Sequence, residues 1–427
     1  MIYKDILPGG LRVLTREMPD VYSVTTSIWA ATGSAYEAAD EGGLSHVLEH
    51  MLFKGTRRRN YQEIAQILED VGGQMNAFTS REYTCYYTHS LSESFELCLD
   101  LLADMYLNSR FPAEEWAKEK GVILEEINMY EDTPDDLVGE LFNRTLFAGH
   151  TYGLPVIGTE QSVGGFEREN IDAYCRAHYA PAHTVLAVAG NVLREQVLAM
   201  AEKYLAAAFA QMGAEQQRTH WDKPRLAAPD YAGGRIYTHK DIEQVHVTLG
   251  VPGLAGNAPD YYTLNILNGV LGGGISSRLF QEVREKRGLT YSVCSNVNAM
   301  AFGGSFSAYA STSPQKADEL LRVLGCEMAK IAAYGISEAE LARAQMQFKA
   351  SLLIAQESSA NVMVRMGRDE VVYQRLRTVE ELVNSVMAVD AAAVQRLAQQ
   401  LLQPQKLALA LVGPVEPGVQ LEELLSC

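Results

Sequence analysis

Hydrophobic residues recur along the chain with the periods of both helices and strands. Residues 315–334 and 338–356 carry apolar side chains at the 3.6-residue spacing of a helix, which predicts two helices that cover a sheet. Residues 184–189 and 407–412 are apolar runs that each follow a proline and end at a glycine. Short apolar runs between turn residues predict buried strands.

The strand signals occur twice, and the spacing between the two copies is constant. Residues 12–15 match residues 235–238, and residues 24–25 recur as residues 247–248. Each of these pairs, like the two apolar runs, is separated by 223 positions. Chance similarity among apolar strands would not keep one offset across a whole half of the chain. We infer an internal duplication of one α/β unit of roughly two hundred residues.

The duplication and the chain length together indicate an α+β fold made of two homologous α/β domains. A chain of 427 residues is too long for a single hydrophobic core. Each domain is expected to contain a mixed β-sheet covered by helices on one face. We place the first domain at residues 1–213, a linker at 214–232 and the second domain at 233–427. The linker is rich in Gln, Ala, Pro and Gly, which are common in irregular connections.

Composition narrows the range of partners. The net charge of −17 argues against nucleic acid and anionic membranes, and it is compatible with cationic peptides as substrates or with solubility alone. No apolar run is long enough to span a membrane, and the N-terminus lacks the apolar stretch of a secretion signal.

The six cysteines form no C-x-x-C pair. This pattern favours reduced thiols in a cytoplasmic protein over a disulfide framework or a cysteine-based zinc site.

The segment His46-Val47-Leu48-Glu49-His50 is the most specific chemical pattern in the chain. On a helix, positions i, i+3 and i+4 share one face, so two imidazoles and one carboxylate lie side by side. Histidines one turn apart form half of a zinc site, and a neighbouring carboxylate can take a proton from water. The order H-x-x-E-H is the inverted form of the common zinc-protease motif. The alternative is an exposed helix with two solvated histidines, but the chain has only nine histidines in 427 residues.

The second copy of the repeat lacks this chemistry. At the 223-residue offset, the three polar residues of the motif are all replaced by glycine: Gly269, Gly272 and Gly273. The apolar positions that would turn toward the core are kept as Leu267, Val270 and Leu271. The first repeat is therefore expected to hold the reaction centre, and the second repeat a different role.

A third ligand is expected from the acidic helical segment 114–126. Glu119 and Glu126 are seven residues apart, which is nearly two helical turns, so they lie on one face. Glu125 points roughly 100° away. Two carboxylates on one face can supply a metal ligand and a group that orients a ligating histidine. The alternative is a solvated helix face, but Lys349 occupies the position of Glu126 in the second repeat, where it would repel a cation.

Together these residues resemble the pitrilysin-type (M16) zinc metallopeptidases. The subgroup that is most similar includes the mitochondrial processing peptidase and its two-domain bacterial relatives. The resemblance covers nearly the whole chain, with no departure at a position that the family uses for chemistry. Besides the histidine motif, it rests on residues 42–45, 53–56, 73–80, 153–159, 272–280 and 284–292.

The roles of the motif residues follow from their chemistry, with support from the resemblance. One Zn²⁺ per chain is expected to be held by His46, His50 and Glu126, which leaves a fourth position for water. Glu49 is expected to take the proton of that water as it attacks a peptide carbonyl, and to pass the proton to the departing amine. Glu119 resembles the family's glutamate that supports the metal histidines.

The resemblance also implies how a peptide is held. Asn76, Ala77 and Phe78 match the family's edge strand, which pairs with an extended substrate through its backbone. Without the resemblance, this segment would be interpreted as an ordinary core strand. In the second repeat, Arg284 and Tyr291 match the family's residues that bind a substrate carbonyl and donate to the developing oxyanion.

The expected function is that of a zinc metalloendopeptidase acting on unfolded peptides or leader segments inside a closed chamber. The resemblance implies that the second domain, without metal, binds substrate and closes this chamber. Because the family's chamber needs four such domains, the chain is expected to act as a homodimer, with a heterodimer as the alternative. Both general peptide degradation and specific leader removal fit the sequence. The alternative from another class is a non-catalytic substrate-binding or structural subunit of a heteromeric peptidase complex.

Overall fold

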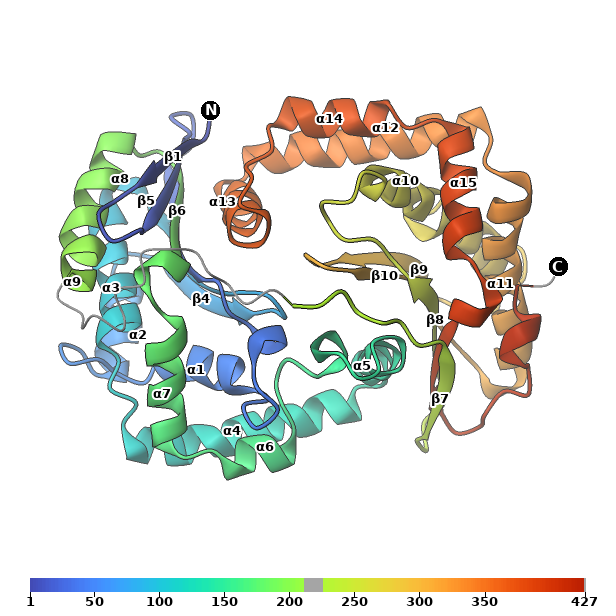
Figure 1. Cartoon of the computed structure of the whole chain (residues 1–427), viewed down its shortest axis with the longest axis horizontal. Coiled ribbons are helices and arrows are strands. Elements are labelled where there is room, and N and C mark those ends of the chain that lie inside the picture. Colours follow the sequence, from blue (N-terminus) through green and yellow to red (C-terminus); the bar gives the residue numbers. More distant parts are fainter. Residues whose placement is uncertain (211–225, 426–427) are drawn as a thin grey trace. The chain divides into compact units, whose positions relative to one another are not determined.

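The computed structural model describes residues 1–210 and 226–425, so much of the expected linker at 214–232 lies outside the described residues. The chain forms two compact units (Figure 1). The first unit comprises Met1–Ile127, Pro155–Leu226 and Ile354–Arg377, and the second comprises Asn128–Leu154, Ala227–Leu353 and Thr378–Cys427. The chain therefore passes between the units more than once.

The first unit is built on a mixed sheet of six strands in the order β1-β2-β6-β3-β5-β4. The pairing of β2 with β6 is parallel, and the other pairings are antiparallel. The strands are β1 (Tyr3–Ile6), β2 (Arg12–Glu17), β3 (Ser23–Ala30), β4 (Gln74–Thr79), β5 (Thr84–Leu91) and β6 (Thr184–Gly190). The helices are α1 (Leu44–Leu52), α2 (Tyr61–Asp70), α3 (Phe95–Asn108), α4 (Ala113–Asp132), α6 (Glu160–Gly165), α7 (Arg168–His178), α8 (Arg194–Ala201), α9 (Ala207–Phe209) and α13 (Ser359–Arg368).

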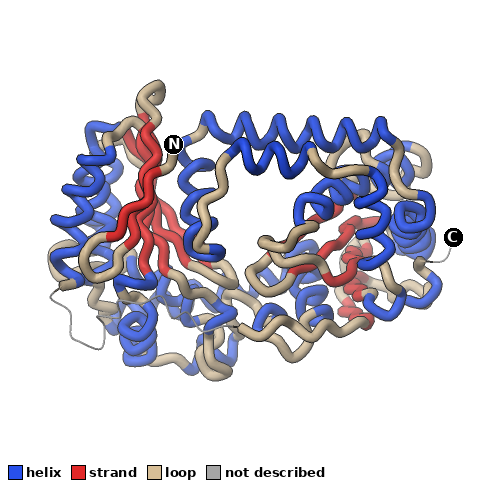
Figure 2. The backbone as a smooth tube through the Cα atoms, turned by 45° about the horizontal axis from the view of Figure 1, so that its top comes forward, coloured by secondary structure: helices blue, strands red, loops and turns tan. Residues whose placement is uncertain are grey.

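The second unit is built on a mixed sheet of five strands in the order β7-β11-β8-β10-β9. Its strands are β7 (Gly234–His239), β8 (Val245–Pro252), β9 (Val293–Ala299), β10 (Gly304–Thr312) and β11 (Ala408–Gly413). Its helices are α5 (Pro134–Leu146), α10 (Tyr261–Gly272), α11 (Ala317–Tyr334), α12 (Glu338–Ile354), α14 (Val379–Met387) and α15 (Ala391–Leu401). Figure 2 shows helices lying against the strands of each sheet.

The strand order confirms that the chain is an internal duplication. If β1 is set aside, the first sheet reads β2-β6-β3-β5-β4, and the strands at the equivalent sequence positions follow the same order in the second sheet. The predicted α+β class with two mixed sheets is therefore confirmed. The two helices predicted at residues 315–334 and 338–356 are α11 and α12.

Helices cover both faces of the first sheet, so the expectation of helices on one face only was wrong. On one face, Val24, Ile28 and Leu186 pack in a core with α1, α3 and α7. On the other face, Trp29 and Val185 pack against apolar residues of α13. The physical reason is that strands β3 and β6 are buried along nearly their whole length, so each face needs an apolar cover.

The two repeats exchange equivalent helices. Helices α5 and α13 lie at matching positions of the repeats, because residues 134–146 shifted by 223 positions fall on residues 357–369. Helix α5 packs on β7, β8 and β11 of the second sheet, although it precedes that sheet in the sequence. Helix α13 packs on β2, β3 and β6 of the first sheet in the same way. Each sheet thus receives its second cover from the other half of the chain.

The described residues bear on the expectations about membrane-spanning segments and reduced cysteines. In the described part of the chain, no helix combines the length and apolar character needed to cross a membrane. Cys85, Cys98, Cys175 and Cys294 are free thiols, as expected. Cys326 is disulfide-bonded, which corrects the expectation of reduced thiols at that position.

We predict that Gly367→Ala in α13 lowers the free energy of unfolding by about 1–3 kcal/mol. A Cβ atom on Gly367 would lie 2.2 Å from the Trp29 ring. That ring is fully buried and its Nε1 donates to Ser27 Oγ at 2.8 Å, so it cannot move away. The control is Gly139→Ala in α5, where an added Cβ meets no atom within 4 Å and the higher helix propensity of alanine is expected to be neutral or stabilising. Urea denaturation followed by circular dichroism measures the stability of both variants. Equal denaturation midpoints would contradict the close contact between α13 and Trp29.

Candidate metal centre

Helix α1 is held in place at its N-terminus by a buried carboxylate. Gly43 precedes the helix with a φ of 100°, a left-handed conformation that glycine adopts at little cost. The carboxylate of Glu37 accepts hydrogen bonds from the backbone N–H groups of Gly43 at 2.7 Å and Ser45 at 2.6 Å. A carboxylate at this end of a helix also interacts favourably with the helix dipole. The sequence gives no sign of this role of Glu37.

The apolar positions of α1 are buried as predicted. Leu44, Val47, Leu48 and Met51 are at most 2% exposed. They leave the opposite face for His46, Glu49 and His50. The position of this face is thus fixed by core packing rather than by the polar residues themselves.

The three predicted metal ligands lie together. The Nε2 atoms of His46 and His50 lie 3.6 Å and 3.5 Å from the same carboxylate oxygen of Glu126, Oε2. One donor atom from each residue falls within 4.8 Å of the others. Donor atoms about 2.0–2.2 Å from a tetrahedral zinc ion lie roughly 3.4 Å from one another. Two imidazoles and one carboxylate at these separations therefore fit Zn²⁺.

Glu119 fixes the orientation of the His50 ring. The Nδ1–H group of His50 donates to Glu119 Oε1 at 2.8 Å, which leaves Nε2 facing Glu126. A carboxylate on the second ring nitrogen is a common partner of a metal-binding histidine. The second oxygen of Glu119 lies 2.6 Å from Lys54 Nζ. The sequence gives no sign of this contact of Lys54.

The site has an electrostatic preference for cations. Burial opposes protonation of His50, but the hydrogen bonds to Glu119 and Glu126 outweigh it and raise the His50 pKa to about 9. The hydrogen bond with His50 lowers the pKa of Glu126. His46 differs, because burial and the neighbouring positive charge of His50 lower its pKa to about 4. The two glutamates on α4 thus stabilise positive charge between the helices.

Glu49 lies on the same face as the histidines and has a partner of its own. Thr79 Oγ1, at the end of β4, donates to Glu49 Oε2 at 2.5 Å. Burial raises the pKa of Glu49, and the hydrogen bond from Thr79 opposes that shift. A half-buried carboxylate with a raised pKa suits a group that accepts and returns a proton. The sequence shows Thr79 next to the predicted substrate strand but gives no sign of its contact with Glu49.

Asn76, Ala77 and Phe78 lie on β4, which is the last strand of the first sheet. One edge of β4 pairs with β5, and within the described residues no strand pairs with its other edge. The Phe78 ring packs edge-on against Trp29 at 5.7 Å between centroids, so this side chain is anchored in the unit. The strand therefore has a fixed position and an edge that no described strand covers, where the N–H of Ala77 donates to Asn76 Oδ1 at 2.8 Å.

Arg284 and Tyr291 lie together in the second unit. Arg284 is in the short π-helix η6 (Phe280–Glu285), and its Nη1 donates to the backbone oxygen of Tyr291 at 2.9 Å. The guanidinium also lies 4.5 Å from the centre of the Tyr291 ring. Tyr291 is 82% exposed, so its hydroxyl is accessible.

The equivalent helix face in the second unit is closely packed at two of the three positions that correspond to the motif. A Cβ atom on Gly272, which replaces Glu49, would lie 2.4 Å from the backbone nitrogen of Ser295 in β9. A Cβ atom on Gly273, which replaces His50, would lie 2.7 Å from the Cα atom of Gly269. The close packing of α10 against β9 therefore occupies the space of the Glu49 side chain, and α10 itself crowds the position of His50.

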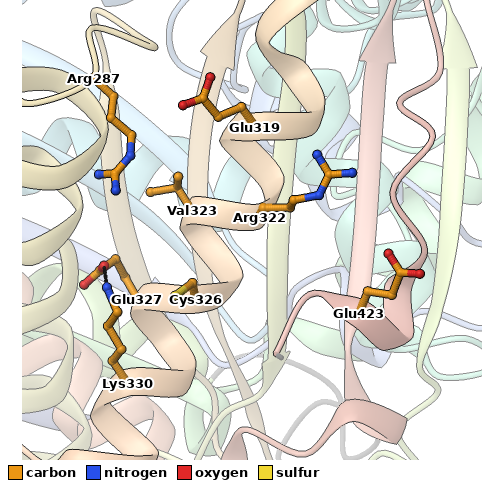
Figure 3. Close-up of a pocket in the computed structure, with 8 residues that line it drawn as sticks. All are labelled: Arg287, Glu319, Arg322, Val323, Cys326, Glu327, Lys330 and Glu423. Carbon is orange, nitrogen blue, oxygen red and sulfur yellow. Dashed lines mark hydrogen bonds and ion pairs between the residues drawn. The ribbon is translucent and has the colours of Figure 1, made fainter. Parts of the chain in front are cut away.

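A pocket of about 450 Å³ lies in the second unit, chiefly along α11 (Figure 3). Its charged residues include both signs, and Glu327 and Lys330 form an ion pair at 2.6 Å. None of its residues belongs to the predicted site. They are Arg287, Glu319, Arg322, Val323, Cys326, Glu327, Lys330 and Glu423.

Comparison with known families places the chain among the M16 peptidases. The sequence pattern of the insulinase family, peptidase family M16, matches residues 12–160. The pattern of the peptidase M16 inactive domain matches residues 165–348. The chain belongs to the M16 peptidase family, as the resemblance implied.

The relatives of this chain include bacterial proteins named as zinc proteases. An uncharacterized zinc protease of Bacillus subtilis, YmxG, is 37% identical over 97% of this chain and 98% of its own length. An uncharacterized zinc protease of Mycobacterium leprae is 38% identical over 97% of this chain and 92% of its own length.

Solved structures show the same fold. A peptidase M16 inactive domain from Pseudomonas fluorescens has a TM-score of 0.88 at 23% identity, and the match covers 98% of this chain and 100% of that one. A protease from Helicobacter pylori has a TM-score of 0.88 at 22% identity, covering 97% of this chain and 99% of that one.

We predict that Glu126→Gln weakens zinc binding by more than about 100-fold. Loss of a group that merely orients a ligand typically costs 10–100-fold in metal affinity, and loss of the charged ligand itself is expected to cost more. The matched control is Glu125→Gln, because Glu125 is an exposed neighbour on the same helix. Competition with a chelating dye measures both affinities. Equal zinc affinity of the two variants would remove Glu126 from the ligand set.

Proposed function

We propose that the protein is a zinc-dependent endopeptidase that cleaves unfolded, extended peptides. The observation that carries the proposal is the arrangement around α1. His46, His50 and Glu126 present a zinc-binding set of donors, and Glu49 lies on the same helix face with a hydrogen bond from Thr79. Membership of the M16 family and relatives named as zinc proteases support this proposal.

In this proposal the chain's own residues divide the work of hydrolysis. Zn²⁺, when bound by His46, His50 and Glu126, would supply the Lewis acidity that makes water a usable nucleophile near neutral pH. Glu49 accepts a proton from the attacking water and returns it to the departing amine. Glu119 keeps Nδ1 of His50 occupied so that Nε2 remains available as a ligand.

The substrate is proposed to bind by addition of a strand. Asn76, Ala77 and Phe78 would pair their backbone with an extended peptide, because β4 is the last strand of its sheet. Backbone pairing depends little on sequence, so selectivity would come from side chains. Arg284 and Tyr291 are proposed, from the family resemblance, to bind a substrate carbonyl and to donate to the developing oxyanion.

A closed chamber, a homodimer and a preference for unfolded peptides complete the proposal, and all three rest on the family resemblance. The substrates would be oligopeptides to be degraded or leader segments to be removed. The alternative, a non-catalytic subunit of a heteromeric peptidase, would not require a general base. Glu49 and the three ligands are all present, which favours catalysis.

We predict that Glu49→Gln retains zinc and loses peptide hydrolysis by at least about 10²–10⁴-fold, because an amide cannot accept the proton. Glu125→Gln serves again as the control. A complex peptide mixture incubated with each variant, with cleavage sites mapped by mass spectrometry and zinc content measured in parallel, gives both readouts. Hydrolysis that survives in Glu49→Gln would refute the assignment. A wild-type protein without zinc or chelator-sensitive cleavage would support the non-catalytic alternative.

We predict that Tyr291→Phe lowers kcat by about 10²–10³-fold, which is the usual effect of removing one oxyanion donor. The ring contact with Arg284 does not need the hydroxyl, so the fold is expected to be unchanged. Tyr334→Phe is the matched control, since Tyr334 is 83% exposed in the same unit. Steady-state kinetics on a fluorogenic peptide distinguish the two, and an unchanged kcat for Tyr291→Phe would contradict the proposed role.

A further inference from the structure

Lys54 lies one helical turn beyond His50 and reaches the same carboxylate. Helix α1 ends at Leu52, and the next residue keeps a helical conformation, with the N–H of Lys54 donating to Met51 O at 3.2 Å. The side chains of His50 and Lys54 therefore point along one face. The carboxylate of Glu119 accepts from both, with Oε1 at 2.8 Å from His50 Nδ1 and Oε2 at 2.6 Å from Lys54 Nζ.

We propose that Lys54 is a positioning residue that holds Glu119 in the geometry required to orient His50 for zinc. This inference rests on the proposed function. A carboxylate with a single partner can rotate about its side-chain bonds, whereas a carboxylate fixed at both oxygens has one orientation. Lys54 fixes the oxygen that His50 does not use, so the carboxylate plane and the imidazole plane are set together.

Charge makes this contact necessary when the site is loaded. A histidine that binds zinc through Nε2 is neutral, so His50 then offers Glu119 a hydrogen bond but no positive charge. The side chain of Glu119 is only 8% exposed, and a buried carboxylate without a nearby cation is costly. Lys54, whose side chain is 26% exposed, supplies that cation at hydrogen-bond distance. Lys54 and His50 thus hold the two oxygens of one buried carboxylate from the same side of α1.

The second repeat supports this grouping. At the 223-residue offset, the three members of the chain of contacts, His50, Lys54 and Glu119, are replaced by Gly273, Ser277 and Ala342. The copy that has no metal ligands thus also has no lysine and no carboxylate at the supporting positions. The three residues are present together in one repeat and absent together in the other.

The test is zinc affinity, measured by chelator competition on the full chain. Lys54→Met is expected to weaken zinc binding by about 10–100-fold, the usual cost of losing a group that supports a ligand. Lys54→Arg keeps the positive charge and can still contact the Glu119 oxygen that His50 does not use. This variant is expected to retain most of the zinc affinity. The matched control is Lys118→Met, because Lys118 forms an exposed ion pair with Glu115 on α4 and its loss should leave zinc affinity unchanged.

A double-mutant comparison tests whether Lys54 acts through Glu119. Adding Lys54→Met to Glu119→Gln should cost little further zinc affinity if the two residues form one unit. Additive losses, or a Lys54→Met variant that binds zinc as tightly as wild type, would overturn the inference. Lys54→Gln, which also removes the positive charge, provides the same comparison if Lys54→Met does not fold. A wild-type protein that binds no zinc would instead overturn the proposed function itself.

Discussion

The packing of α1 against α4 is the constraint on which the metal centre depends. One helix supplies the imidazoles and the general base, and the other supplies the carboxylates. Val47 and Leu48 of α1 share a buried cluster with Trp116 and Ile123 of α4, so apolar contacts set the distance between the helices. Interiors are too densely packed to allow gradual adjustment. The core therefore anchors both helices, and on them the side chains of His46 and His50 lie 3.6 Å and 3.5 Å from Glu126.

Much of this arrangement could be predicted from the sequence because it is local. The i, i+3 and i+4 spacing in α1 and the seven-residue spacing in α4 each place side chains on one face of a helix. The constant 223-residue offset likewise predicted two similar sheets, since matching strand positions require matching topology. The meeting of the two helices was supplied by the family resemblance, because periodicity does not state which helices are neighbours.

Other features could not be predicted, because they depend on contacts between distant segments. Thr79 and Lys54 each have a short polar side-chain contact whose partner is set by tertiary packing. The apolar pattern of α5 and α13 predicts a buried face but does not specify which sheet that face covers. The exchange of these helices was therefore not visible in the sequence.

The helix exchange makes the packing of each repeat depend on the other repeat. A fragment that ended before α13 would leave Trp29 and Val185 exposed to water on one side of its sheet. A fragment that began after α5 would leave Gly250 without Phe142, the residue that packs against it. Each repeat thus covers one face of its sheet with a helix that belongs to the other repeat. Synthesis as one continuous polypeptide supplies both halves in equal amounts, so each sheet always has its exchanged helix at hand.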